Sequence, residues 1–349
     1  MRKTVVAAVT IGTAVLLLLT ILYATVTTRQ PSQFDSGYRI VMGTFSRVVS
    51  LARSEAVARN GAEAALDVQR RVDERMSTYI VDSELSQVNR QAFGQAVGVS
   101  EETFEVLQKA KHFSELTGGA FDITIGPLGD LWHRAGDANV PPTEPEIADV
   151  RNKVGYEKLL LDPDARTVRF AVEGMKLDLG GIAKGYAIDK SVQAMKQGGA
   201  VGGMVDIGGD VRCFGTPPKG KKAWVVGLQD PTVAPDDMAT DKLLLTLSVT
   251  DAAVTTSGDY RRFTEVQGQK QSHILDAESG RGAGKLASVT IIAPDALTAD
   301  ALATAVSVLG LDKGLALIER LPETEAILIP NQSNAQPVFT TGARVYVRQ

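Results

Sequence analysis

The sequence predicts an α+β fold with a largely antiparallel sheet and packed helices, in one large domain that follows an N-terminal membrane segment. Segments with strand character occur in runs and do not alternate strictly with helical segments. The chain has 349 residues, 44% of them hydrophobic, so it can bury a sizeable core. The net charge of −4 becomes more negative if the leader is removed, which argues against nucleic acid as a partner.

Residues 1–28 are predicted to be a membrane anchor or a signal segment. After Arg2 and Lys3 no charge occurs before Arg29, and residues 5–26 are almost wholly apolar. As a helix they would reach about 33 Å, enough to cross a bilayer core. The basic residues place the short end in the cytoplasm. A cleaved signal peptide is the alternative, but its apolar core usually runs about 7 to 15 residues, which favours an uncleaved anchor. No cysteine follows that could carry a lipid.

Residues 29–37 predict a linker, because they combine Gln, Pro, Ser and Gly, and the folded domain is expected at 38–349. Helices are expected where apolar residues recur every three or four positions and where Ser, Thr or Gly punctuates the ends. Thr143 and Glu146 fit a capping box. The expected helices are 54–75, 84–89, 101–117, 144–154, 182–197, 294–309 and 312–320.

Strands are expected where apolar and polar residues alternate or where short apolar runs are bounded by turn residues. Asp162, Pro163 and Asp164 form a turn sequence that makes its two flanking strands a hairpin. The expected strands are 40–42, 48–51, 120–125, 156–161, 167–170, 175–179, 204–207, 224–228, 243–249, 253–256, 273–275, 288–292, 326–329 and 344–347.

The stretch 174–215 contains two expected strands that each end in a glycine pair, Gly180-Gly181 and Gly208-Gly209. The first pair opens a helix. Free backbone N–H groups and the positive end of a helix dipole would suit a phosphate there. Two plain tight turns explain the same pattern equally well, since neither pair fits a dinucleotide fingerprint or a P-loop.

Asp300 and Thr304 lie four residues apart on an expected helix, so both oxygens project from one face. A carboxylate with a hydroxyl suits a hard cation such as Mg²⁺. The alternative is structural: Thr298 is a good N-cap, and an acidic residue in the first turn complements the helix dipole.

The remaining reactive residue types are few. The three histidines include no H-x-x-x-H pair, which argues against zinc. His273, at a strand edge, is either a hydrogen-bonded structural residue or a base. Cys213 is the single cysteine and is expected to be a buried apolar residue. No G-x-S-x-G elbow occurs, which argues against a serine hydrolase.

Taken together, these segments resemble the FAD:protein FMN transferases, the ApbE-like flavin transferases of bacterial envelopes. The resemblance covers nearly everything after the linker. It rests on the following segments, in this order: Met42-Gly43-Thr44-Phe45, Met76-Ser77-Thr78-Tyr79, Asp82 to Ser86, Gly119 to Asp122, Gly126-Pro127-Leu128 with Leu131-Trp132, Asp178 to Tyr186, Asp206 to Gly209, Thr256 to Tyr260, His273 to Asp276, and Thr298 to Thr304.

The resemblance implies a site for FAD and for Mg²⁺. The residues implied to line the FAD site are Met42, Tyr79, Ala120, Phe121, Asp122, Asp178, Lys184 and Ile274. The Mg²⁺ is implied to be held by the backbone carbonyl of Gly181 together with Asp300 and Thr304. A carbonyl ligand requires no side chain, so glycine is tolerated at 181. The glycine pair and the Asp300–Thr304 face would then be two halves of one metal and diphosphate site.

The implied reaction is metal-assisted phosphoryl transfer. A Thr or Ser hydroxyl of a partner protein attacks the phosphorus on the flavin side of FAD, AMP leaves, and FMN remains as a phosphoester. Mg²⁺ and Lys184 would neutralise charge on the diphosphate, and His273 is the candidate base. A Mg²⁺-dependent FAD diphosphatase giving FMN and AMP, and a non-catalytic FAD-storage protein, remain alternatives.

The implied acceptors are membrane-associated electron-transfer subunits that carry FMN on a Thr- or Ser-containing motif. The expected location is the inner membrane, with a single-pass anchor and the catalytic domain on the periplasmic side.

Overall fold

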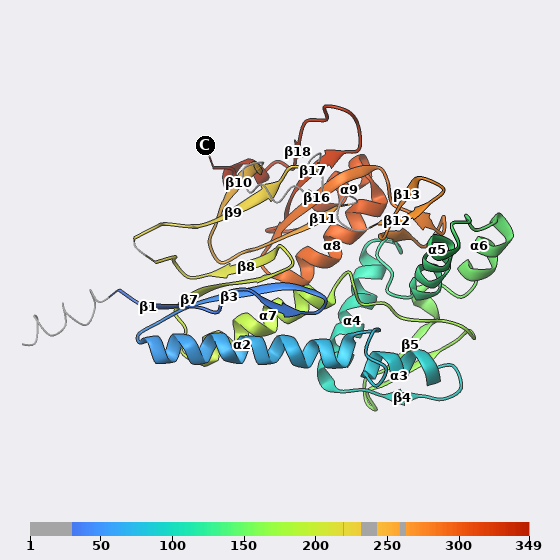
Figure 1. Ribbon diagram of the computed structural model, residues 1–349, viewed down its shortest axis with the longest axis horizontal. Coiled ribbons are helices and arrows are strands. Elements are labelled where there is room, and N and C mark those ends of the chain that lie inside the picture. The colour runs from blue at the N-terminus through green and yellow to red at the C-terminus, as the bar shows by residue number, and fades with distance from the viewer. Residues whose placement is uncertain (1–29, 219, 232–242, 259–262, 349) are drawn as a thin grey trace, which may run out of the picture.

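The computed structural model describes residues 30–218, 220–231, 243–258 and 263–348 (Figure 1). The predicted anchor at residues 1–28 lies outside these residues. Within them, no helix combines the length and the apolar character needed to cross a bilayer.

The helices begin and end close to the predicted positions, with one addition, α5. They are α2 (Glu55–Met76), α3 (Glu84–Gln91), α4 (Glu101–Leu116), α5 (Gly126–Ala138), α6 (Glu144–Arg151), α7 (Ala183–Gln197), α8 (Ala296–Leu309) and α9 (Leu311–Ile318), with short 3₁₀ helices at Tyr156–Lys158 and Ala343–Tyr346.

The strands are mostly short, and half of them belong to one sheet. They are β1 (Ser32–Asp35), β2 (Arg39–Val41), β3 (Thr44–Ala52), β4 (Val97–Gly98), β5 (Leu159–Asp162), β6 (Thr167–Phe170), β7 (Gly202–Ile207), β8 (Asp210–Phe214), β9 (Trp224–Gln229), β10 (Leu243–Val249), β11 (Ala253–Gly258), β12 (Phe263–Val266), β13 (Gln269–Ser272), β14 (Leu275–Asp276), β15 (Arg281–Gly282), β16 (Leu286–Ala293), β17 (Glu325–Pro330) and β18 (Val338–Phe339).

The main sheet is antiparallel between all the strand pairs described in it, which confirms the predicted α+β class. Its strand order is β1-β3-β7-β8-β11-β16-β17-β18, and β2 also pairs with β3. Helices α2, α7, α8 and α9 cover one face, and the β9–β10 hairpin covers part of the other (Figure 1). Cys213 is buried beneath that hairpin, as expected of a small apolar residue.

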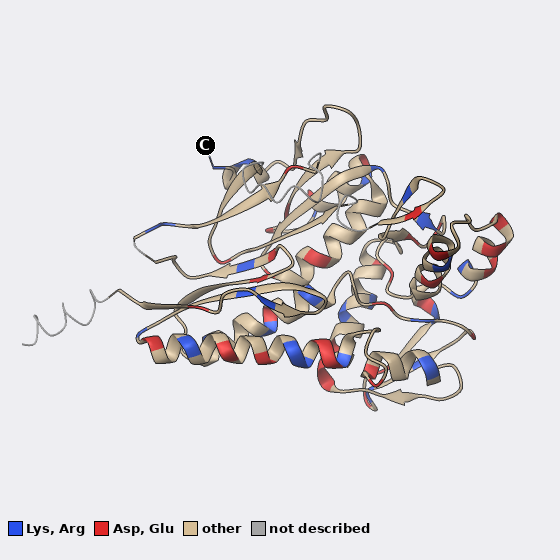
Figure 2. Cartoon of the chain, in the orientation of Figure 1, with Lys and Arg blue, Asp and Glu red and all other residues tan. Residues whose placement is uncertain are grey.

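Helix α2 shows how local sequence determines packing. Ser54 is its N-cap, and its side chain accepts the N–H of Val57. Small residues on the inner face, Ala58, Ala62 and Ala65, are fully buried. Charged residues lie along the outer face (Figure 2). The small side chains let α2 pack closely on α7 and the sheet.

Helices α7 and α8 pack even more closely, and this packing positions the site. A Cβ on Gly185 would lie 2.3 Å from the carbonyl oxygen of Ala296, so the two backbones touch there. Helix α8 is rich in alanine, and Asp300 is its single charged residue. A carboxylate in such a buried, apolar helix requires partners.

A smaller unit lies beside the main sheet, toward the right of Figure 1, where α5 and α6 pack with β12 and β13. The indole N–H of Trp132 donates to the carbonyl of Gly280 at 2.8 Å, which ties α5 to the β14–β15 connection. The predicted capping box of Thr143 and Glu146 is confirmed at the start of α6, as is the predicted hairpin of β5 and β6.

Several predicted boundaries were wrong. Part of the predicted linker 29–37 is the edge strand β1, which pairs with β3 from Ser32–Ala52 to Asp35–Val49. The expected strands 120–125 and 175–179 are loops joined by a single bridge between Ile125 and Lys176. The expected strand 344–347 is mostly 3₁₀ helix. The pairing of β1 with β3 is a tertiary contact, so the local sequence did not reveal it.

Candidate active site at the start of helix α7

The first feature of the site is the approach of Gly181 to helix α8. A Cβ built on Gly181 would lie 2.8 Å from the Thr304 hydroxyl oxygen and 3.3 Å from the Phe121 ring. Only a residue without a side chain fits between these two groups. Gly181, Phe121 and Thr304, which were predicted from three distant segments, are therefore neighbours.

The second feature is a buried charge cluster one turn further along α7. The Lys184 ammonium forms an ion pair with Asp210 and lies 3.4 Å from Asp300 Oδ1. The other oxygen of Asp300 accepts the N–H of Gly185 at 2.9 Å. Asp300 is 2% exposed and Asp210 6% exposed. The structure thus brings together four predicted site residues, Gly181, Lys184, Asp300 and Thr304, and adds Asp210.

Burial dominates the electrostatics of this cluster. Desolvation raises the pKa of Asp300 to about 6, although the nearby Lys184 ammonium opposes the shift. The two carboxylates raise the pKa of Lys184 above its usual value, against the effect of its burial. Lys184 is therefore a permanent cation here.

The donor set fits a hard divalent cation. It comprises the Asp300 carboxylate, the Thr304 hydroxyl and the backbone carbonyl of Gly181, which are oxygen ligands of the kind Mg²⁺ prefers. The Thr255 hydroxyl, on the strand that packs against α8, is buried and has no hydrogen-bond partner among the described residues. No group of three or more His, Cys, Asp or Glu side chains suited to a metal occurs in the described part of the chain. A metal here would accordingly need the hydroxyl and carbonyl oxygens.

The two glycine pairs form turns whose donors are largely used internally. The Gly180 N–H donates to Asp178 Oδ1 at 2.7 Å, and the Gly209 N–H donates to Asp206 Oδ1 at 2.8 Å. The Gly208 N–H donates to the Phe45 carbonyl at 2.8 Å. For these three N–H groups the plain-turn interpretation holds. Among the described residues, positive charge at the site comes chiefly from Lys184.

The residues predicted from the segment 120–122 have mixed surroundings. The Phe121 ring is buried against Gly181. Ala120 lies in the preceding bend. Asp122 accepts the backbone N–H groups of Thr124 at 2.7 Å and Tyr156 at 2.9 Å, so its carboxylate secures a loop in this structure. Burial raises the pKa of Asp122 despite these bonds.

Three other predicted FAD contacts lie on loops. Met42 adopts a left-handed conformation, φ 51°, in the β2–β3 turn, where its N–H donates to Asp73. Asp178 lies in the loop before α7. Tyr79, in the loop after α2, is 96% exposed and is not part of the buried cluster.

His273 and Ile274 lie in a bend between β13 and β14, not in the strand that the sequence predicted. His273 is exposed and Ile274 is buried. Because the imidazole is exposed on a bend, an incoming substrate can reach it.

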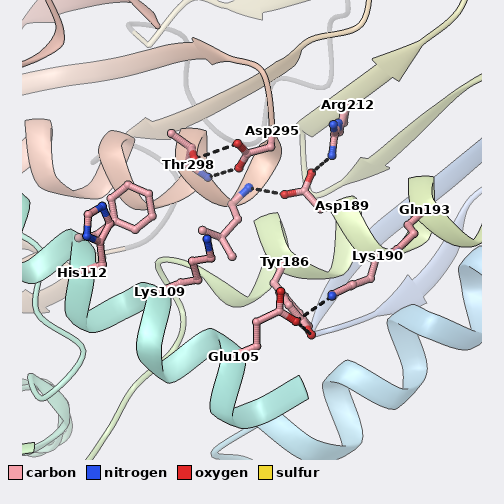
Figure 3. Close-up of a pocket in the computed structure, with 12 residues that line it drawn as sticks. Glu105, Lys109, His112, Tyr186, Asp189, Lys190, Gln193, Arg212, Asp295 and Thr298 are labelled. Atoms are coloured by element: carbon pink, nitrogen blue, oxygen red, sulfur yellow. Dashed lines mark hydrogen bonds and ion pairs between the residues drawn. The ribbon is translucent and has the colours of Figure 1, made fainter. Parts of the chain in front are cut away.

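A separate pocket of about 440 Å³ lies between α4, α7 and the N-terminus of α8 (Figure 3). It is lined by none of the predicted FAD or metal residues. Asp189 lies there, accepting the N–H groups of Ala296 and Leu297 and pairing with Arg212.

The N-cap of α8 is Asp295, which accepts the Thr298 N–H, so the prediction of Thr298 as N-cap was wrong.

Asp210 is the site residue that the sequence did not reveal. It directly follows Gly208-Gly209, a motif already singled out, but nothing local indicates that its carboxylate meets Lys184. That contact depends on the packing of β8 against α7.

Comparison with known proteins identifies the family of this chain. The model of the ApbE family matches residues 42–328. The FAD:protein FMN transferase of Vibrio cholerae is 35% identical over 251 residues, 71% of this chain and 73% of the relative. That of Treponema pallidum is 33% identical over 304 residues, 83% of each chain.

Solved structures show the same fold. The ApbE protein of Thermotoga maritima superposes with a TM-score of 0.79 at 33% identity, covering 92% of this chain and 100% of that one. The flavin transferase ApbE of Vibrio cholerae superposes with a TM-score of 0.76 at 27% identity, covering 90% and 99%. Residues 42–328, which the family model matches, contain every predicted site residue. The chain therefore belongs to the ApbE family.

Proposed function

We infer that this member of the ApbE family is a FAD:protein FMN transferase, and we propose that it works with Mg²⁺ and releases AMP. The observation that carries the proposal is the convergence of Gly181, Lys184, Asp300 and Thr304 at one place. Three oxygen donors and a fixed ammonium suit a divalent ion and a diphosphate side by side.

In this proposal each residue of the cluster has a separate task. Lys184 places a permanent positive charge against the diphosphate, where charge builds up as AMP departs. Asp300, Thr304 and the Gly181 carbonyl would hold the Mg²⁺, which when bound supplies further positive charge to the diphosphate oxygens. The close packing of α7 on α8 fixes their positions before substrate arrives.

The transfer itself needs a base. A Thr or Ser hydroxyl oxygen of the acceptor forms a bond to the flavin-side phosphorus, and the bond from that phosphorus to the oxygen of AMP breaks. The hydroxyl proton passes to His273, whose exposed position gives an acceptor protein access. The remaining predicted residues, Met42, Tyr79, Phe121, Asp178 and Ile274 among them, would surround the FAD.

The location and the acceptors belong to the same proposal. The apolar residues 5–26, preceded by Arg2 and Lys3, support a single-pass anchor in the inner membrane with the catalytic domain on the periplasmic side. An enzyme held there would meet membrane-associated electron-transfer subunits in two dimensions, and these are the acceptors we propose.

One experiment distinguishes transfer from its alternatives. The protein is incubated with FAD, Mg²⁺ and an acceptor fragment that carries a threonine motif, and the fragment is then weighed by mass spectrometry. A mass increment equal to FMN esterification, with AMP in solution, is expected. Free FMN and AMP with an unmodified fragment would indicate a diphosphatase, and unchanged FAD would indicate storage; either result would contradict the proposal.

A further inference from the structure

One ammonium group serves two buried carboxylates in this site. Lys184 pairs with Asp210 and lies 3.4 Å from Asp300. Both carboxylates are almost completely buried, and each would be costly to leave without a partner. Among the described residues the cluster has one cation for two anions. When ionised it therefore has an excess negative charge that a further cation can balance.

The two oxygens of Asp210 face different elements. Oδ1 accepts the N–H of Thr256 at 3.2 Å, and Oδ2 pairs with Lys184. One oxygen of the carboxylate is therefore held by the backbone of β11, and the other oxygen holds the Lys184 ammonium. Asp300 is fixed in a similar way by the Gly185 N–H, but its second oxygen faces the shared ammonium.

We propose that Asp210 is a positioning residue, the counter-ion that holds Lys184 and so leaves Asp300 available to a divalent cation. The inference rests on the proposed function, because it concerns the same site. An ammonium near Asp300 competes with a divalent ion for that carboxylate. While Asp210 is present, Lys184 retains a partner after the divalent ion occupies Asp300. Without Asp210, Asp300 is the remaining carboxylate for both cations.

The test measures binding of Mn²⁺ alone to the full-length chain, without FAD, from the loss of the free Mn²⁺ signal in electron paramagnetic resonance. Asp210→Asn is expected to raise the Kd at least tenfold. Adding Lys184→Met to Asp210→Asn removes the competing ammonium together with its counter-ion. The double variant is expected to return the Kd to within about threefold of the parent.

Arg212→Gln is the matched control. The Asp189–Arg212 pair also joins α7 to β8, but with the charges exchanged between the two elements. Asp189 keeps the N–H groups of Ala296 and Leu297 after the substitution. Arg212→Gln removes an ion pair between the same two elements and should leave Mn²⁺ affinity unchanged. A loss of affinity seen only in Asp210→Asn is then not a general effect of weaker packing between α7 and β8.

The outcomes separate the inference from the proposed function. Equal affinity of the parent and Asp210→Asn overturns the inference, as does a double variant that binds as weakly as Asp210→Asn. If Asp210→Asn does not fold, the double variant, which keeps the net charge, is compared directly with the parent. A Kd within threefold supports the inference, and one more than tenfold higher contradicts it. Absence of Mn²⁺ binding in the parent contradicts the cation site of the proposed function itself.

Discussion

The hydroxyl of Thr304 lies against the backbone of Gly181, so close that a Cβ on the glycine would lie 2.8 Å from it. This contact joins the start of α7 to the middle of α8. It places a carbonyl-bearing residue, a hydroxyl and, one turn earlier on α8, the Asp300 carboxylate in one small volume.

Gly181→Ala should therefore damage the site by sterics alone. The added methyl group would meet Thr304 and Phe121 in a packed region, and such overpacking costs about 1–3 kcal/mol. We expect a lower free energy of unfolding in urea and weaker divalent binding. Gly129→Ala is the matched control, since a Cβ there meets nothing within 4 Å. Unchanged stability and binding in Gly181→Ala would show that Gly181 does not lie this close to Thr304 and Phe121.

Asp300→Asn should remove FMN transfer while the fold persists. The amide keeps the shape of the side chain and can still accept the Gly185 N–H, but it loses the charge that a cation needs. We expect turnover to fall roughly a hundredfold or more, because a bound metal supplies several kcal/mol of charge stabilisation. Full turnover of this variant at limiting Mg²⁺ would refute the metal assignment.

The same residue predicts how stability depends on pH without divalent ions. Burial raises the pKa of Asp300 to about 6, above the unfolded value of roughly 3.9. Its contribution to the free energy of unfolding is thus fully present below about pH 4 and is lost as pH rises through 6. Relative to Asp300→Asn, which does not titrate, the parent should lose on the order of 2 kcal/mol between pH 4 and pH 7. Urea unfolding in EDTA measures this, and a constant difference between the two proteins would contradict it.

His273→Ala should slow the chemical step more than it weakens FAD binding. Loss of a general base costs typically 10²–10⁴-fold in rate, so we expect at least a hundredfold lower single-turnover rate with FAD affinity within about twofold. His133→Ala is the control, since His133 lies exposed on α5 near Asp137. If His273→Ala turns over like the parent, His273 is not the base.

The edge strand β1 should contribute to stability. A chain beginning at residue 38 lacks four residue pairs of the β1–β3 ladder and the ion pair of Asp35 with Arg47. Compared with a chain beginning at residue 30, we expect its free energy of unfolding to be lower by about 2 kcal/mol, a few ladder hydrogen bonds and one half-exposed ion pair. Identical urea midpoints would mean that residues 30–37 behave as the linker that the sequence predicted.

Local signals explain which elements could be predicted from the sequence. Ser54, Ser83, Ser100 and Thr143 each cap a helix whose position was predicted, because capping depends on residues three apart. Helix α5 was missed although Pro127 in its first turn is a common start signal. Strand β1 carries no such signal, since its pairing depends on β3.

The same distinction between local and tertiary contacts explains which parts of the site could be predicted. Asp300 and Thr304 share a helix face, so their proximity follows from the sequence alone. The contact of Thr304 with Gly181 was expected only from the family resemblance, and in the structure these two residues are neighbours. The role of Asp210 depends on how β8 packs against α7, which no local pattern specifies.

The central claim is that a divalent ion binds where α7 begins and α8 passes it. Crystals grown with FAD and Mn²⁺ in place of Mg²⁺ would locate the ion by its anomalous scattering. We predict a peak within coordination distance of the Gly181 carbonyl, the Asp300 carboxylate and the Thr304 hydroxyl, beside the FAD diphosphate. A manganese peak elsewhere, with FAD bound and this cluster unchanged, would contradict the account.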